Sequence, residues 1–271
     1  MSEATAPATT LGVVRLRSLA LPAEHGGWGM LAEALLLGLL VAPSLAGLGV
    51  GLAALGAFLL HHPLKLALAD RLRGTRNART AAAERFVVLY GALAAAGLAV
   101  ATGGRAGWWL PLAAAAPLVL VQLAYDAGHR GRRLVPELLG GVAFSSVTAA
   151  EMLAAGWPLG PSLAASAILG AKTVGAVLYV RARLRCERGL TPDRTAAVGS
   201  HAAALVLGIA LAGAGAAPWL VVSAFTLLLA RSAHGLSRFH RPARPQAVGI
   251  QELAYGLVFV FILIVGYRLG L

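Results

Sequence analysis

The sequence predicts an all-α polytopic membrane protein in which about nine transmembrane helices form one bundle. Hydrophobic residues make up 58% of the 271 residues, charged residues only 13%, and the mean hydropathy is +0.76. Apolar segments long enough to cross a hydrocarbon core recur along the chain. Basic residues gather in alternate loops between these segments. Soluble globular domains have a more even balance, so these observations exclude that class.

Each apolar segment predicts one helix, and Pro and Gly residues punctuate the segment ends and turns. We expect a polar and basic arm over residues 1–20 and a single transmembrane domain over residues 21–271. The expected helices cover residues 27–45, 45–62, 84–103, 107–125, 134–156, 159–180, 196–214, 216–232 and 249–268.

The positions of Lys and Arg predict the topology. Of 23 such residues, 20 lie in the amino-terminal arm and the even-numbered loops, and the others are Arg105, Lys172 and Arg268. The positive-inside rule then places the amino terminus in the cytoplasm and the carboxyl terminus outside. The net charge of +12 is spread over four loops without an aromatic platform, so nucleic acid is not an expected partner. The single Cys186 excludes an intramolecular disulfide and a multi-cysteine metal site.

A polar cluster, "LPAEHGGWGM", stands immediately before the first apolar run. Glu24 and His25 are the candidate catalytic residues, because an imidazole beside an acid can move a proton. His25 is equally suited to donate a hydrogen bond to a lipid headgroup. In the alternative interpretation Trp28 is an interfacial anchor and Glu24 complements the dipole of the first helix. A metal held by His25 with His61 or His62 is the least supported option, because their spacing forms no ligand pattern.

Two cytoplasmic loops carry more charge than topology requires. The first, "HHPLKLALADRLRGTRNARTAAAERF", follows the second segment, and the second, "VLYVRARLRCERGLTPDR", continues the sixth. Lys172, Tyr179 and Arg183 fall near one helical face, which predicts a cationic stripe from the bilayer interior to its surface. Such a stripe suits a bound phosphate or carboxylate, and the alternative is snorkelling of side chains at helix ends. The candidate anion-binding residues are His61, His62, Lys65, Asp70, Arg71, Arg73, Lys172, Tyr179, Arg181, Arg183 and Glu252.

Four acidic residues fall within the expected helices: Glu33, Glu137, Glu151 and Glu252. Each is costly in lipid, so each must face protein or water. Two interpretations have equal weight. The acids form a polar central cavity with Lys172, or they form ion pairs with Lys and Arg residues that fix helix packing.

The organisation resembles the UbiA superfamily of intramembrane prenyltransferases, which have nine helices, a cytoplasmic amino terminus and functional loops after helices two and six. Those enzymes hold a prenyl diphosphate through Mg²⁺ bridged by two aspartate-rich motifs. The corresponding stretches here are "LKLALADRLRGTR" and "YVRARLRCERG", and only Asp70 remains in the core of the first. Because a Mg²⁺ site needs paired carboxylates, the metal-dependent step is not carried over. We predict no cofactor and assign no metal ligand, and the sequence leaves a need for Mg²⁺ open.

The chain more closely resembles the YwiC-like family of bacterial integral membrane proteins. The resemblance rests on "PAEHGGWGM", "HHPLKLALADRLRG", "LYVRARLRCERG" and "RPQAVGIQELAYG", which occur in the family's order. It implies a multi-pass protein of the bacterial cytoplasmic membrane and does not supply an activity.

Two function classes fit these residues. In the first, a UbiA-like enzyme takes an isoprenoid diphosphate or similar anionic lipid, which Arg71, Arg73, Arg181 and Arg183 hold. In the second, a transporter of a small anion or lipid uses the same basic residues as a vestibule and couples the buried acids to protons. A non-catalytic membrane subunit is a third possibility. Membrane lipids are the expected partners.

Overall fold

The computed structural model describes residues 19–22, 25–75, 77–128, 130–131 and 133–271. Within this part of the chain there are nine α-helices and no strand. The nine predicted helices are therefore confirmed. The helices are α2 (His25–Val41), α3 (Leu45–Leu72), α4 (Ala78–Ala101), α5 (Leu110–Ala127), α6 (Leu134–Ala154), α7 (Leu159–Glu187), α8 (Arg194–Gly213), α9 (Leu220–Gly235) and α10 (Pro245–Leu269).

Seven of these helices are long and apolar enough to cross a membrane, and α2 and α9 are shorter apolar helices of 17 and 16 residues. The predicted class, an all-helical polytopic membrane protein, is thus confirmed. Two helices run beyond their apolar segments, since α3 continues to Leu72 and α7 to Glu187, and for α7 the sequence predicted this continuation into the basic stretch. The apolar pattern stops where each helix leaves the hydrocarbon, whereas Leu, Ala and Arg continue to favour helix beyond that point.

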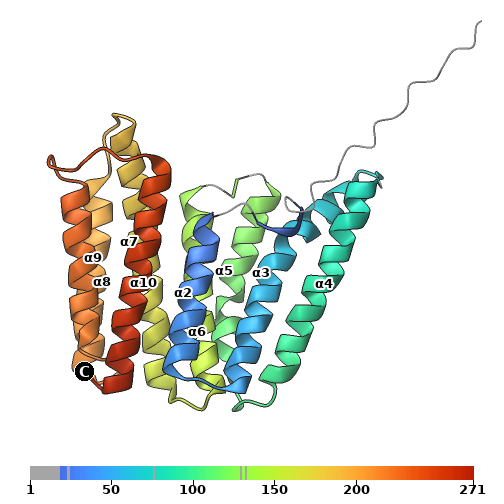
Figure 1. Cartoon of the computed structure of the whole chain (residues 1–271), viewed down its shortest axis with the longest axis horizontal. Helices are drawn as coiled ribbons and strands as arrows, with labels where there is room; N and C mark the ends of the chain where they lie inside the picture. Colours follow the sequence, from blue (N-terminus) through green and yellow to red (C-terminus); the bar gives the residue numbers. More distant parts are fainter. Residues whose placement is uncertain (1–18, 23–24, 76, 129, 132) are drawn as a thin grey trace, which may run out of the picture.

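The helices stand in an elongated row (Figure 1). The α3–α4 hairpin lies at one end of the row, the α8–α9 pair at the other, and α2, α6, α7 and α10 lie between them. In their most apolar windows α6 and α7 are 67% and 61% buried, whereas α4 is 11% buried. The central helices therefore make the core, and the outer ones face the lipid.

The α3–α4 hairpin packs backbone against backbone through glycine. A Cβ added at Gly56 would lie 2.6 Å from the backbone nitrogen of Ala94, and one at Gly97 would lie 2.6 Å from the carbonyl oxygen of Gly49. Small residues allow such close approach, which supplies van der Waals contact where lipid offers no hydrophobic drive. At the start of α4, Asn77 and Thr80 form a reciprocal capping box.

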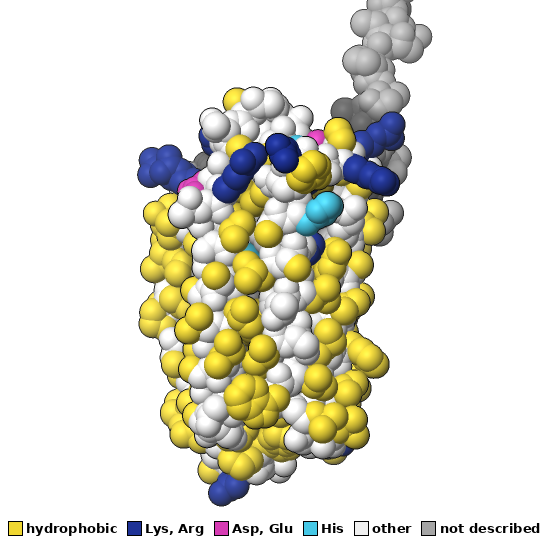
Figure 2. Space-filling view, turned by 90° about the vertical axis from the view of Figure 1, so that its left-hand side faces the viewer, with side chains coloured by type: hydrophobic (Ala, Val, Ile, Leu, Met, Phe, Trp, Pro, Cys, Tyr) yellow, Lys and Arg dark blue, Asp and Glu magenta, His cyan; other side chains and the backbone are white. Residues whose placement is uncertain are grey.

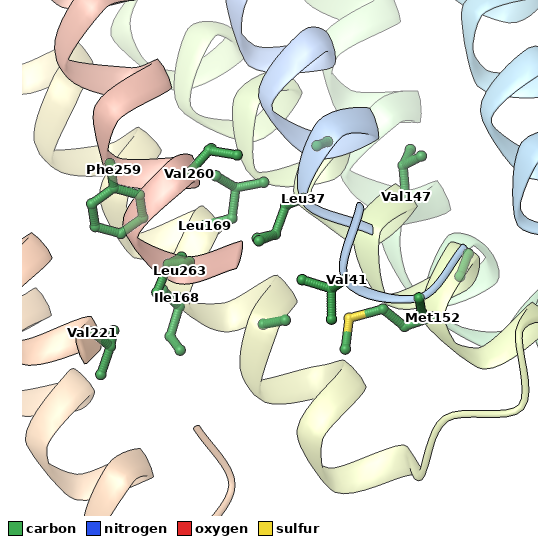
Figure 3. Packing of buried hydrophobic residues seen from close by; sticks show 14 of the residues in the cluster. Leu37, Val41, Val147, Met152, Ile168, Leu169, Val221, Phe259, Val260 and Leu263 are labelled. Carbon is green, nitrogen blue, oxygen red and sulfur yellow. The ribbon is translucent and has the colours of Figure 1, made fainter. Parts of the chain in front are cut away.

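The main hydrophobic core joins the two halves of the row. Figure 3 shows side chains from α2, α6, α7, α9 and α10 meeting there. Leu37 and Ile168 are fully buried, and the rings of Phe225 and Phe259 lie 5.0 Å apart. The helices that contribute to this core, α2, α6, α7, α9 and α10, also carry Glu33, Glu151, Lys172, Arg231 and Glu252.

The two ends of the bundle differ in charge. The α3–α4, α5–α6, α7–α8 and α9–α10 loops lie at the end of the bundle where α2 begins, and the carboxyl terminus lies at the other (Figure 1). On the face drawn in Figure 2, Lys and Arg gather at that first end above apolar sides. We call it the basic end. The cytoplasmic orientation of this end stays a prediction of the positive-inside rule.

Candidate functional site

A column of buried polar residues runs along α7 toward the basic end. Lys172, Tyr179 and Arg183 are 3%, 5% and 5% exposed, as expected for residues that share one inward face. Eleven residues of helix separate the first from the last, so the column is about 16 Å long. Side chains from α2, α8, α9 and α10 complete it.

The deepest part of the column is an ion pair between α2 and α7. Lys172 donates to both carboxylate oxygens of Glu33, at 2.6 and 2.7 Å, and both side chains are 3% exposed. Gly256 of α10 covers the pair, and a Cβ at that position would lie 2.9 Å from the Lys172 Nζ. The sequence left open a polar cavity around Lys172 or ion pairs that fix helix packing, and this part of the site is an ion pair.

Above this pair lies a second one between α9 and α10. Arg231 donates from Nη1 to the Oε2 of Glu252, and the two side chains are 7% and 15% exposed. The guanidinium carbon of Arg231 lies 3.9 Å from the ring centroid of Tyr179 and 5.1 Å from that of Tyr255. The aromatic faces hold the cation by cation–π attraction.

Several buried polar atoms of this upper group have no hydrogen-bond partner within the described part of the chain. They are the Nε and Nη2 of Arg231, the Oε1 of Glu252, the Oγ of Ser232 and the Nε2 of His201. The His201 ring lies edge-on to Tyr179, with centroids 6.5 Å apart, and its Nδ1 is 2.8 Å from the carbonyl oxygen of Ala197. Buried polar groups are nearly always paired, so this concentration marks the site most suited to a ligand.

Arg183 closes the column at the basic end and holds protein groups. It donates to the carbonyl oxygens of Gly235 and Arg241, at 2.8 and 2.5 Å, and it pairs with Glu187 at 2.8 Å. It therefore ties α7 to the end of α9 and to the α9–α10 loop. Beside this tie is an open depression of about 300 Å³ lined by Leu184, Glu187, Arg188, Pro242, Ala243, Arg244 and Pro245.

The other candidate residue at the basic end of α7 contacts a neighbouring helix. Arg181 donates from Nε to the Oε2 of Glu137 on α6 at 2.8 Å, and about a third of each side chain is exposed. An exposed pair of this kind is screened by solvent and contributes little to stability.

The candidate residues of α3 lie near the opposite end of the row. Asp70 is buried and accepts a hydrogen bond from the Thr80 hydroxyl at 2.9 Å, which ties the two helices of the hairpin together. Arg71 pairs with Glu84 at 2.7 Å, and its side chain is 67% exposed. Lys65 and Arg73 are exposed.

The two histidines of α3 are partly buried. His61 lies 3.4 Å from the carboxylate of Asp126 on α5, and His62 also takes part in an interaction. The candidate residues of α3 and those at the basic end of α7 therefore lie in two separate parts of the row (Figure 1).

The predicted catalytic pair cannot be placed on this map. Glu24 lies outside the described residues. His25 begins α2, and its side chain lies outside what the structure describes. Among the described residues no group of three or more His, Cys, Asp and Glu side chains is arranged to hold a metal ion.

Sequence reasoning missed three residues of the upper group: Arg231, His201 and Tyr255. Arg231 was counted among the basic residues of a loop, although the expected helix over 216–232 already contained it. An arginine inside an apolar segment is itself a functional signal, and it would have found this residue. His201 and Tyr255 have no comparable signal, because their role comes from helices that are distant in sequence.

The fold and the column define a class, a multi-pass helical membrane protein with buried ion pairs between its central helices. Residues 21–152 match the family model described as YwiC-like protein. This match confirms the YwiC-like resemblance that the motifs predicted over 132 of the 271 residues of the chain. No curated protein and no solved structure matches it. The matched range contains α2 to α6, and the helices that carry Lys172, His201, Arg231 and Glu252 follow it.

Proposed function

We propose that this protein binds the anionic head of a lipid inside the membrane, with Arg231 as the main contact. The sequence suggests an isoprenoid diphosphate or a similar anionic lipid. One observation carries the proposal: the Nε and Nη2 of Arg231 are buried and have no partner among the described residues. These two nitrogens form the edge of the guanidinium that grips phosphate or carboxylate with two parallel hydrogen bonds.

The surroundings of Arg231 support an anion of this kind. Tyr179 and Tyr255 fix the cation from its faces, and Glu252 occupies only the Nη1 side, so the other edge keeps a defined direction. The Ser232 hydroxyl and the His201 Nε2 are further unpartnered groups of the same region. A fixed fork loses less entropy on binding than a mobile one.

Charge balance gives His201 a role in the proposal. Lys172 and Arg231 are matched by Glu33 and Glu252, so the site is close to neutral before an anion arrives. A bound anion therefore needs an added positive charge or a lost negative one. His201, whose Nε2 is buried and has no partner among the described residues, is the group of this site that takes up the proton when the anion binds.

A lipid is favoured over a free anion by the place of the site. Arg231 and Glu252 lie on helices whose outer faces expose Leu227, Leu253 and Leu257 to the bilayer. A lipid can keep its tail in the hydrocarbon beside α9 and α10 while its head reaches the guanidinium. In this proposal the basic end faces the cytoplasm of a bacterial cell, and the protein lies in the cytoplasmic membrane.

The test is native mass spectrometry with lipid extraction on detergent-purified protein. Arg231→Lys keeps the positive charge next to Glu252 and removes the two-nitrogen edge, so it isolates the proposed contact. Arg268→Lys is the matched control, because Arg268 is exposed at the opposite end and donates to the Leu40 carbonyl oxygen. We expect a co-purifying anionic lipid in wild type and in the control and its loss in Arg231→Lys. Equal lipid content in all three proteins contradicts the proposal.

A further inference from the structure

Glu151 is a fully buried acid that the column does not use. It lies on α6 near the end opposite the basic end, its exposed fraction is 0%, and neither carboxylate oxygen has a hydrogen-bond partner among the described residues. Three residues of helix separate it from Ala154, so it is about 4.5 Å from the end of α6. It contrasts with Glu33, whose two oxygens both accept from Lys172.

Glycines of two neighbouring helices shape the space around this carboxyl group. A Cβ at Gly51 of α3 would lie 2.9 Å from the Oε1 of Glu151, and a Cβ at Gly38 of α2 would overlap the Oε2. The side chains of Leu35 and Leu39 are close to Gly51. The carboxyl group is therefore enclosed by α2, α3 and its own helix, in a space that would be filled if either glycine had a side chain.

No charged group compensates this acid. The carboxyl group of Glu151 is buried, and no charged group of the described residues interacts with it. Two arginines lie at this end, and both are bound to backbone carbonyl oxygens: Arg105 to Gly156 and Arg268 to Leu40. Tyr267 also lies at this end, and its ring packs against Trp157.

On its own helix, the nearest polar neighbour of Glu151 toward the basic end is also occupied. Thr148 donates its hydroxyl to the carbonyl oxygen of Ala34 on α2, at 3.0 Å. Gly38 of α2 and Gly51 of α3 approach its carboxyl oxygens, and glycine has no titratable side chain. Transfer of an unpaired carboxylate into such surroundings is far more costly than keeping the proton on it.

We propose that Glu151 is a proton-binding site, held as a neutral carboxylic acid in this structure. Loss of the proton to water requires α6 to separate from α2 and α3, because the closed space cannot solvate a carboxylate. The site lies at the end opposite Arg231, so a proton bound there exchanges with the other side of the membrane. This inference does not depend on the proposed lipid site, and a proton-coupled transporter is the function class that it favours.

Infrared spectroscopy of the whole protein in lipid tests the proposal, because the carbonyl stretch of a protonated carboxyl is separate from the bands of carboxylates. We compare wild type with Glu151→Gln, which has nearly the shape of the neutral acid, at neutral pH. Glu84→Gln is the control, because Glu84 is an ion-paired acid near the surface. We expect a protonated-carboxyl band in wild type and in the control, its loss in Glu151→Gln, and its downshift after transfer to D₂O.

Two results overturn the proposal. One is that the wild-type spectrum has no protonated-carboxyl band, or has one that Glu151→Gln does not remove. The other is a large fall in the melting temperature of Glu151→Gln, because replacement of a neutral acid by an amide of the same shape leaves packing intact. A variant that fails to fold therefore contradicts the proposal as well. A loss of lipid binding in Arg231→Lys leaves this inference untouched, so the two proposals fail separately.

Discussion

The ion pair between Lys172 and Glu33 predicts an asymmetry between single and double substitution. Lys172→Met leaves the Glu33 carboxylate buried without the donor that now lies 2.6 and 2.7 Å from its oxygens. Breaking a buried pair in this way destabilises a protein by about 3–5 kcal/mol. For a chain of this size the melting temperature falls by roughly 6–20 °C, at about 2–4 °C per kcal/mol.

The double variant Glu33→Gln with Lys172→Met removes both charges and recovers most of this loss, because replacing a whole buried pair is often neutral. Lys65→Met is the matched control, since Lys65 is exposed, and we expect a change within about 0.5 kcal/mol. The assay is thermal unfolding in detergent, followed by tryptophan fluorescence. If Lys172→Met melts like Lys65→Met, or if the double variant melts at least as low as the single one, the pair does not stabilise the bundle.

Three further predictions concern the α3–α4 hairpin and use the same melting assay. Gly97→Ala places a methyl group against the backbone near Gly49 and destabilises the protein by about 1–3 kcal/mol. Gly91→Ala, on the same helix, places its methyl group in open space and stabilises the protein by up to about 1 kcal/mol. Equal melting temperatures of the two variants would refute the close packing. Asn77→Ala removes the α4 cap and costs about 1 kcal/mol, so an unchanged temperature contradicts the cap. Arg71→Gln removes an exposed pair and costs less than about 1 kcal/mol, and a larger loss would show that this pair is structural.

Hydropathy was sufficient to predict the fold class and the nine helices of the described part of the chain. Nine apolar segments became nine helices, because each segment must satisfy its backbone hydrogen bonds internally in lipid. The same reasoning correctly marked Lys172 as an internal residue rather than a snorkelling one. Helix ends were less predictable, since α3 continues beyond the hydrocarbon as a polar helix.

The partners of the charged residues could not be predicted from spacing. Arg183 shares the face of Lys172, as expected, yet its donors point at carbonyl oxygens of the α9–α10 region, which lies more than 50 residues away. Asp70 was considered as a remnant of a metal site or a salt-bridge partner, and it accepts a hydrogen bond from Thr80. In each case the partner is fixed by tertiary packing, which a single sequence does not display.

Arg231, on which the proposed lipid site rests, was not among the residues that the sequence predicted for a site. Arg231 agreed with the positive-inside rule as a loop residue, so its position inside the expected helix over 216–232 was not used as a functional signal. Its position three residues after Leu228, in a helix that ends only at Gly235, places it inside the bundle. A basic residue that agrees with the positive-inside rule and also lies within an apolar segment is a candidate functional residue.

The central claim is that the free edge of Arg231 binds an anionic lipid head, and ligand-dependent melting in nanodiscs tests it most directly. Wild type and Arg231→Lys are melted with farnesyl diphosphate, with farnesol and without ligand. A ligand present at 100 times its Kd stabilises by about 2.7 kcal/mol. We predict that only the diphosphate raises the melting temperature of wild type and that Arg231→Lys loses this response. Equal shifts with farnesol, or an unchanged response in Arg231→Lys, would contradict the claim.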